Sequence, residues 1–208
     1  LDHPVVILPN PFYQTYAAAA HVADAEAVLL DAVAGNNFLP DLDSLDAELL
    51  ERTVAFYVAS PTNPEGFVAD TAYWQRLIGL ARKHRFYIFA DECYSEIYRD
   101  TPPPGILQAA KAMGTDFSNI IVLNSLSKRS NLAGLRCGFA AGDPEFLRNL
   151  EIRRRNQAEA DRLKKLKEEL DAKDRKLDAG SAEAGGTGGA GDAHEPGDAG
   201  TPGTDEVK

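Results

Sequence analysis

Short apolar runs alternate with amphipathic helical segments throughout the first 150 residues of the chain. The runs, such as VVIL at 5–8 and IIVL at 120–123, are bounded by Pro or Asn and have the length of a strand buried on both faces. Strands that alternate with helices build βαβ units, in which the strands run parallel and helices cover both faces of the sheet. We therefore predict an α/β fold, with three αβα layers around a mostly parallel sheet.

The same patterns give the bounds of the expected elements. Strands are predicted at 5–8, 27–30, 53–59, 86–90, 120–124 and 136–141, and helices at 14–22, 44–51, 71–84, 106–113 and 144–155. Polar clusters follow three of these strands: SPTNPEG after residue 59, DECY after residue 90 and SLSK after residue 124. Because ligands bind at the carboxyl ends of the strands in an open parallel sheet, we expect these clusters to converge on one crevice.

The composition changes after residue 150, which separates a folded core at 1–150 from the C-terminal part of the chain. Residues 151–178 are rich in strong helix formers and charges, with Leu163, Leu170 and Leu177 seven residues apart. A solvated helix and a short coiled coil both fit, and polar residues at several seam positions favour the solvated helix. Residues 179–208 hold nine of the chain's 17 glycines, among Ala, Asp, Thr and Pro, and are expected to form a disordered tail.

The formal net charge of −10 is concentrated in the tail, where residues 178–208 contain seven acidic residues and one lysine. Basic residues cluster inside the charged helix, among acidic ones, so we expect neither a nucleic-acid surface nor a basic membrane patch. No apolar run approaches the ~20 residues of a bilayer-spanning helix, and no secretion signal is expected. Cys93 and Cys137 are too few for a disulfide framework or a zinc cluster, so we expect a reducing, cytoplasmic setting and no bound metal.

Lys128 follows an apolar strand in the sequence SLSKRSN, and Arg136 lies eight residues further on. An amine held near apolar structure and other cations gives up its proton more readily and can then form a Schiff base. Taken alone, a lysine after a strand is more often a solvated surface residue.

Four more candidate residues also come soon after predicted strands. Asp91 follows the apolar run 86–90, and a carboxylate there needs a partner, which makes it either a helix N-cap or the partner of a bound cation. Tyr94 either faces the same cleft or packs in the core. Asn63 is held in a turn by two prolines and a glycine, and the ring of Tyr13 could cover a flat aromatic ligand. A plain turn asparagine and a packed aromatic ring are the alternatives for these last two.

The order and spacing of these residues carry more information than any one of them. Along the chain they are Tyr13, Asn63 in an Asn-Pro-x-Gly turn, Asp91, Tyr94, and Ser125-x-x-Lys128 with Arg136 eight residues on. This series resembles the large-domain core of the fold-type I pyridoxal 5′-phosphate (PLP) dependent aminotransferases of class I and II. The stretch SLSKRSNLAGLRCGF is similar to the PLP-lysine signature of that family, with Cys137 where the signature usually has an aliphatic residue or alanine. Together with PFYQTY and DECYSEIY, it is most similar to N-succinyldiaminopimelate aminotransferases of bacterial lysine biosynthesis.

The resemblance implies a role for each residue. Lys128 would hold PLP as a Schiff base and move the proton at the α-carbon of the substrate. Asp91 would keep the pyridine nitrogen protonated. The other cofactor-binding residues would be Asn63 and Tyr94 at the phenolic oxygen, Tyr13 on the ring face, and Ser125 and Arg136 at the phosphate.

The implied activity is transamination between an amino acid and a 2-oxo acid, with N-succinyl-LL-2,6-diaminopimelate and 2-oxoglutarate as the expected pair and a homodimer as the expected assembly. A PLP-dependent lyase on the same fold and a non-catalytic fragment that only binds a partner are the alternatives. The resemblance covers about 5–153. The family's preceding phosphate-loop segment, and the smaller C-terminal domain that grips the substrate carboxylate, are not matched, so a partial large domain is expected.

Overall fold

The computed structural model describes residues 2–184. The contacts divide the chain into two units, Leu1–Arg153 and Arg154–Lys208. The first unit contains the sheet, the helices that pack on it and every candidate site residue.

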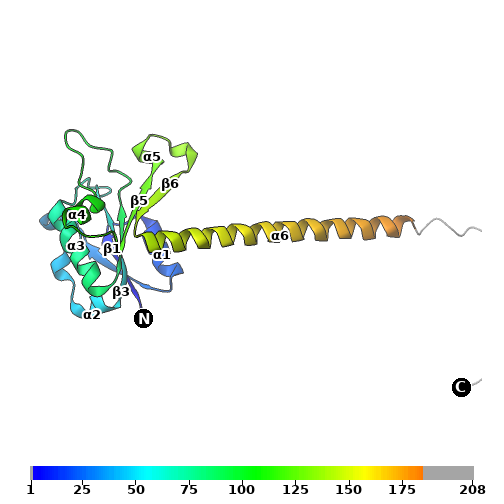
Figure 1. The fold of residues 1–208 in the computed structure, drawn as a ribbon, viewed down its shortest axis with the longest axis horizontal. Coiled ribbons are helices and arrows are strands. Elements are labelled where there is room, and N and C mark those ends of the chain that lie inside the picture. Colours follow the sequence, from blue (N-terminus) through cyan, green and yellow to red (C-terminus); the bar gives the residue numbers. More distant parts are fainter. Residues whose placement is uncertain (1, 185–208) are drawn as a thin grey trace, which may run out of the picture. The chain divides into compact units, whose positions relative to one another are not determined.

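One sheet organises the first unit (Figure 1). Its six strands lie in the order β2-β1-β3-β4-β5-β6, with parallel pairing from β2 to β5 and antiparallel pairing of β6 with β5. The strands are β1 (Val5–Asn10), β2 (Glu26–Asp31), β3 (Thr53–Ala59), β4 (Tyr87–Asp91), β5 (Ile120–Ser125) and β6 (Gly138–Gly142). The predicted mostly parallel sheet is confirmed, and no predicted strand end is displaced by more than two residues.

Helices cover both faces of this sheet (Figure 1). Val5 and Ile7 of β1 point into a core shared with α3 and α4, whereas Val6 and Leu8 pack against Tyr16 of α1. Because alternate side chains of a strand point to opposite faces, α1 lies on the other side of the sheet from α3 and α4. The helices are α1 (Gln14–Val22), α2 (Ala47–Arg52), α3 (Thr71–His84), α4 (Ile106–Ala112), α5 (Leu126–Arg129) and α6 (Pro144–Ala184), with single 3-10 turns η1 (Ala34–Asn36), η2 (Leu42–Ser44) and η3 (Ala133–Leu135). This arrangement confirms the three αβα layers.

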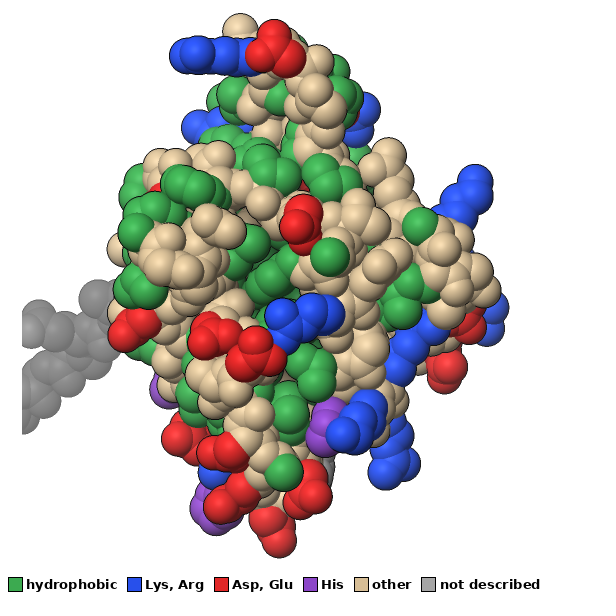
Figure 2. Space-filling view, turned by 90° about the vertical axis from the view of Figure 1, so that its left-hand side faces the viewer, with side chains coloured by type: hydrophobic (Ala, Val, Ile, Leu, Met, Phe, Trp, Pro, Cys, Tyr) green, Lys and Arg blue, Asp and Glu red, His purple; other side chains and the backbone are tan. Residues whose placement is uncertain are grey.

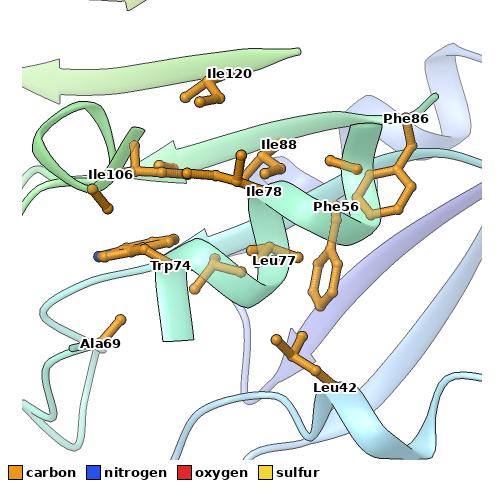
Figure 3. Close-up of a cluster of buried hydrophobic side chains, with 14 of the residues drawn as sticks. Leu42, Phe56, Ala69, Trp74, Leu77, Ile78, Phe86, Ile88, Ile106 and Ile120 are labelled. Atoms are coloured by element: carbon orange, nitrogen blue, oxygen red, sulfur yellow. The ribbon is translucent and has the colours of Figure 1, made fainter. Parts of the chain in front are cut away.

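Helix α3 supplies most of the core on its face of the sheet. It begins where the Asp70 side chain accepts a hydrogen bond from the Tyr73 backbone N–H at 2.7 Å, and it ends at Arg85, whose φ of 62° stops the helix. Its buried side chains recur at helical spacing: Trp74, Leu77, Ile78 and Ala81. They pack against the strands and against Ile106 of α4 (Figure 3). Full burial of such side chains contributes about 1.5–3 kcal/mol each, so α3 is a main anchor of the fold.

On the face of the sheet that α3 covers, charged groups contribute less to the stability of the fold than the apolar core does. Acidic side chains gather toward the end that carries α2, at the bottom of the view in Figure 2. Asp43 pairs with Arg76 of α3, and both side chains are more than half exposed. Exposed ion pairs of this kind stabilise a fold by about 0–1 kcal/mol. The buried side chains of Leu42 and Leu50 therefore hold this end of the unit to the core.

The C-terminal part of the described chain differs from the prediction. A helix at 144–155 and a separate charged helix at 151–178 are predicted, whereas the structure forms one continuous helix, α6 (Pro144–Ala184). Strong helix formers fill 151–178 without a glycine or proline, so nothing in the sequence interrupts the helix there. The predicted tail begins at 179, but residues 179–184 continue α6, and the rest of the tail lies outside the described residues. Across residues 2–184, no helix is long and apolar enough to cross a membrane.

Gly142 closes the antiparallel pair β5–β6, and we expect alanine at this position to destabilise the fold. Gly142 has a φ of 137°, and a Cβ there would overlap the backbone carbonyl oxygen of Ile120. Gly142→Ala should therefore lower the free energy of unfolding by at least ~2 kcal/mol in urea titrations. Gly79→Ala is the matched control, because Gly79 lies within α3 and a Cβ added there would meet nothing within 4 Å. This control should gain about 0.5–1 kcal/mol, and equal losses in both variants would contradict the assignment.

Glu92 gives a pH-dependent prediction. Its half-buried carboxylate accepts a hydrogen bond from the Ile106 backbone N–H at 2.9 Å, and burial raises the pKa of Glu92 above its ordinary value of 4.5. Ionisation therefore costs more in the folded chain than in the unfolded chain, and this cost develops as the pH rises through the folded pKa. Glu92→Gln keeps an acceptor oxygen and removes the charge.

The free energy of unfolding of Glu92→Gln, relative to that of the unaltered chain, should rise as the pH increases from about 4.5 toward neutrality and stay constant below that range. Urea titrations at a series of pH values measure this difference. Asp2→Asn, at an exposed residue near the start of the described chain, is the control for the loss of one negative charge. A constant difference between Glu92→Gln and the unaltered chain across the range would show that Glu92 ionises without cost.

Candidate functional site

A cavity of about 680 Å³ opens at the carboxyl ends of the parallel strands. All the residues singled out in the sequence line it: Tyr13, Asn63, Asp91, Tyr94, Ser125, Lys128 and Arg136. They come from the segments that follow β1, β3, β4 and β5, and Arg136 comes from the segment before β6. The expected convergence of the polar clusters on one crevice is therefore confirmed.

Asp91 is the most firmly held polar side chain of this cavity. It is the last residue of β4, and its Oδ2 accepts a hydrogen bond of 2.5 Å from the hydroxyl of Tyr16. Its Oδ1 accepts a second hydrogen bond, at 3.1 Å, from the backbone N–H of Cys93. No helix begins at Asp91, so the N-cap alternative is wrong and the carboxylate instead stabilises the turn after β4. Two donors from the protein fix its direction toward the cavity.

Tyr16 is a site residue that was not singled out in the sequence. It lies one turn of α1 after Tyr13 and is 4% exposed. Its ring stacks on Tyr57 with centroids 4.6 Å apart, and Tyr57 stacks in turn on Phe89 at 4.8 Å. Burial and the neighbouring Asp91 carboxylate raise the pKa of Tyr16, so its hydroxyl stays protonated and donates to Asp91. The signal for Tyr16 is its place three residues after Tyr13, on the apolar face of a helix.

Tyr13 and Tyr94 offer aromatic surface and a hydroxyl to the cavity. Tyr13 lies just before α1 and meets Tyr16 edge to face, with centroids 5.9 Å apart, while Tyr13 itself is 61% exposed. Tyr94 is half-buried and lines the cavity three residues after Asp91. The exposed face of Tyr13 is therefore free to pack against a flat ligand.

Lys128 lies in α5, a single helical turn that is not among the helices predicted from the sequence. The turn begins at Ser125, whose hydroxyl accepts a hydrogen bond from the Ser127 backbone N–H at 3.1 Å. Lys128 itself is exposed, so the apolar surroundings expected for its amine are absent from this part of the described chain. Within residues 2–184 it forms no ion pair, whereas the neighbouring Arg129 pairs with Glu96 at 3.7 Å. The Lys128 amine is thus available to a ligand in the cavity.

Arg136 and two serines provide hydrogen-bond donors on the same side of the cavity. Arg136 follows η3 with a φ of 49°, and its guanidinium donates to the Ala133 carbonyl oxygen at 3.3 Å. Ser125 and Ser127 share a hydrogen bond of 3.0 Å between their hydroxyls. A guanidinium beside two hydroxyls suits the oxygens of a phosphate group.

Asn63 is placed by a turn that its neighbours hold rigidly. The Thr62 backbone N–H donates to the Phe67 carbonyl oxygen at 2.7 Å, and the Gly66 N–H donates to the Thr62 carbonyl oxygen at 3.0 Å. The Thr62 hydroxyl accepts a further bond from the Phe67 N–H at 2.9 Å. Glu65, in the same turn, also lines the cavity and was not singled out in the sequence.

The residues present fit the expected coenzyme. Asp91 is a fixed acceptor for a ring N–H, Lys128 is an available amine for an aldehyde, and Arg136 with the serines can bind a phosphate. Cys93, which also lines the cavity, has a pKa raised to about 12 by burial and by Asp91, so its thiol is not a competing nucleophile. The cavity therefore offers a partner for the ring nitrogen, the aldehyde and the phosphate of PLP.

The comparisons with known proteins agree with this geometry. Residues 2–162 match the family model described as aminotransferase class I and II. The LL-diaminopimelate aminotransferase of Halothermothrix orenii is 34% identical over 149 residues, which are 70% of this chain and 37% of that protein. The chain therefore spans little more than a third of the length of this curated relative.

Solved structures of aminotransferases are also similar to this chain. An aminotransferase from Neisseria meningitidis is 42% identical with a TM-score of 0.71, over 74% of this chain and 39% of that chain. The probable N-succinyldiaminopimelate aminotransferase of Thermus thermophilus is 34% identical with a TM-score of 0.63, over 73% of this chain and 40% of that chain. Both matches extend over about three quarters of this chain and under half of the solved one.

The bond between Tyr16 and Asp91 can be measured with a double-mutant cycle. Tyr16→Phe combined with Asp91→Ala should show a coupling of about 1–3 kcal/mol in the free energy of unfolding, because either single variant removes the hydrogen bond between the Tyr16 hydroxyl and the Asp91 carboxylate. Urea titrations of the four chains give this value. Tyr57→Phe in place of Tyr16→Phe is the control, because among residues 2–184 the Tyr57 hydroxyl has no hydrogen-bond partner. Equal coupling in the two cycles would show that the hydroxyl of Tyr16 has no special contact with Asp91.

Proposed function

The chain belongs to the class I and II aminotransferases, and from this premise we propose that its cavity binds PLP and serves the transfer of an amino group from an amino acid to a 2-oxo acid. The observation that carries the proposal is the position of Asp91. Its carboxylate is fixed by Tyr16 and Cys93 in the same cavity as the available Lys128 amine. A carboxylate can pair with a protonated pyridine nitrogen, and an amine in the same cavity can form a Schiff base with the aldehyde.

The coenzyme, when bound, supplies a protonated ring that takes up the negative charge developing at the substrate's α-carbon. Asp91 would accept a hydrogen bond from the protonated ring nitrogen, because two donors of the protein fix its carboxylate at the wall of the cavity. Lys128 would hold the coenzyme through its amine, and the same amine would be the group that moves a proton at the substrate's α-carbon.

The remaining residues bind and orient the coenzyme. Asn63 and Tyr94 would donate to the phenolic oxygen, and the exposed ring of Tyr13 would cover one face of the pyridine. Ser125 and Arg136 bind the phosphate, Arg136 through charge-assisted hydrogen bonds. All of these side chains line the cavity in which Asp91 and Lys128 lie.

The proposed amino donor is a 2,6-diaminopimelate, with 2-oxoglutarate as the acceptor. The motifs PFYQTY and DECYSEIY favour N-succinyl-LL-2,6-diaminopimelate, in agreement with the name of the Thermus thermophilus structure. The name of the Halothermothrix orenii relative favours the unacylated LL-2,6-diaminopimelate as a second candidate. A place in lysine biosynthesis, a cytoplasmic setting and a homodimeric assembly belong to the same proposal and follow from the family.

Lys128→Ala tests the proposal without a measurement of activity. The unaltered chain mixed with PLP should develop a visible absorption band, and borohydride should fix the coenzyme to the peptide that contains Lys128. Lys128→Ala should remove both signals and leave the far-UV circular dichroism spectrum unchanged, because Lys128 is exposed and forms no ion pair among residues 2–184. Lys111→Ala, at an exposed lysine of α4 outside the cavity, should keep both signals. A band that survives Lys128→Ala would overturn the role of this residue.

A further inference from the structure

Glu65 is an acidic residue of the cavity, and the proposed binding of PLP leaves it without a partner. Two acidic side chains line the cavity, Asp91 and Glu65. Both oxygens of Asp91 accept hydrogen bonds from the protein. Within residues 2–184, the carboxylate of Glu65 has neither a hydrogen-bond nor an ion-pair partner. Glu65 is thus a free negative charge on the wall of a cavity.

The turn that carries Glu65 is held in place. Hydrogen bonds of the Thr62 and Gly66 backbones close it, and the Ser60 hydroxyl accepts a bond of 3.0 Å from the Ala69 N–H behind it. Phe67 packs against Phe38, another residue of the cavity wall, with centroids 4.9 Å apart. The backbone of Glu65 is therefore fixed beside the cavity, and its side chain is half-buried.

The two cationic side chains of the cavity are accounted for by the proposed coenzyme. Lys128 attaches to the aldehyde, and Arg136 binds the phosphate. With both cations engaged by PLP, Glu65 lines the same cavity without a protein cation to neutralise it. A carboxylate that lines a cavity without a protein partner is free to accept charge-assisted hydrogen bonds from a cationic group on a ligand.

We propose that Glu65 binds the distal ammonium group of a diamino-acid donor and so favours the free diamine over a donor whose distal amine is acylated. This inference rests on the proposed function and decides between its two donors. LL-2,6-diaminopimelate carries a distal ammonium group that can pair with the carboxylate of Glu65. N-succinyl-LL-2,6-diaminopimelate carries an amide in its place and an additional carboxylate, which Glu65 repels.

Equilibrium binding tests this selection. Isothermal titration calorimetry of the 208-residue chain loaded with PLP gives the dissociation constants of the two diaminopimelates. The unaltered chain should bind LL-2,6-diaminopimelate about tenfold more tightly than its N-succinyl derivative, because a charge-assisted hydrogen bond is worth at least ~1.4 kcal/mol, or a factor of ten. Glu65→Gln keeps the size of the side chain and removes the charge, so it should abolish this preference.

Glu48→Gln is the matched control, because it removes the same charge from an exposed residue of α2 that does not line the cavity. It should keep the preference of the unaltered chain, and unchanged far-UV spectra should show that both variants fold. Equal affinity of the PLP-loaded chain for the two ligands, or a preference that Glu65→Gln leaves intact, overturns the inference. The absorption band of PLP is recorded in the same samples: its absence contradicts the proposed function and the inference with it, whereas a band without the preference overturns the inference alone.

Discussion

The parallel pairing of β3, β4 and β5 is the constraint on which the site depends. In register, Ala59 lies opposite Asp91, and Asp91 lies opposite Leu123. Backbone hydrogen bonds continue the pairing past the strand ends, from the Ser60 N–H to the Asp91 carbonyl oxygen and from the Glu92 N–H to that of Leu123. The chain segments that leave these strands therefore start side by side at one edge of the sheet. Residues far apart in the sequence, such as Asn63 and Lys128, meet in one cavity because of this edge.

The polar groups at this edge are tolerated because the protein itself supplies their partners. A carboxylate at the end of a buried strand loses hydrogen bonds to water. For Asp91, hydrogen bonds from the Tyr16 hydroxyl and the Cys93 N–H replace them. Tyr16 can reach Asp91 because α1 packs on the face of the sheet opposite to α3 and because its ring is stacked on Tyr57. The orientation of one functional carboxylate is thus tied to the packing of an entire layer.

The sequence alone predicted the strands, the layers and seven of the residues that line the cavity, and it missed others, such as Tyr16, for physical reasons. Apolar runs such as 53–59 mark buried strands directly, and α3 has both a capping residue and a clear apolar stripe. The contact of Tyr16 with Asp91 joins residues 75 positions apart, so no local pattern reveals it. The exposure of Lys128 could not be predicted from the apolar strand before it. It depends on where the whole segment 126–137 lies, which tertiary packing determines. The change in composition near residue 151 predicts a boundary between two helices, but no glycine or proline lies within 151–178, and α6 continues through it.

The two sides of the cavity differ in how firmly the core holds them. Asp91 and Tyr16 lie on a buried strand and on a packed helix, whereas Lys128, Arg136 and most of the segment between them are exposed. That segment is joined to the rest of the unit through the antiparallel pair β5–β6 and through the ion pair of Arg129 with Glu96 at 3.7 Å. Few buried apolar contacts mean a low local free energy of opening. A ligand that binds Asp91 at one end and Arg136 at the other would therefore add contacts on the side where the protein supplies fewest, and its binding energy would order the segment that carries Lys128.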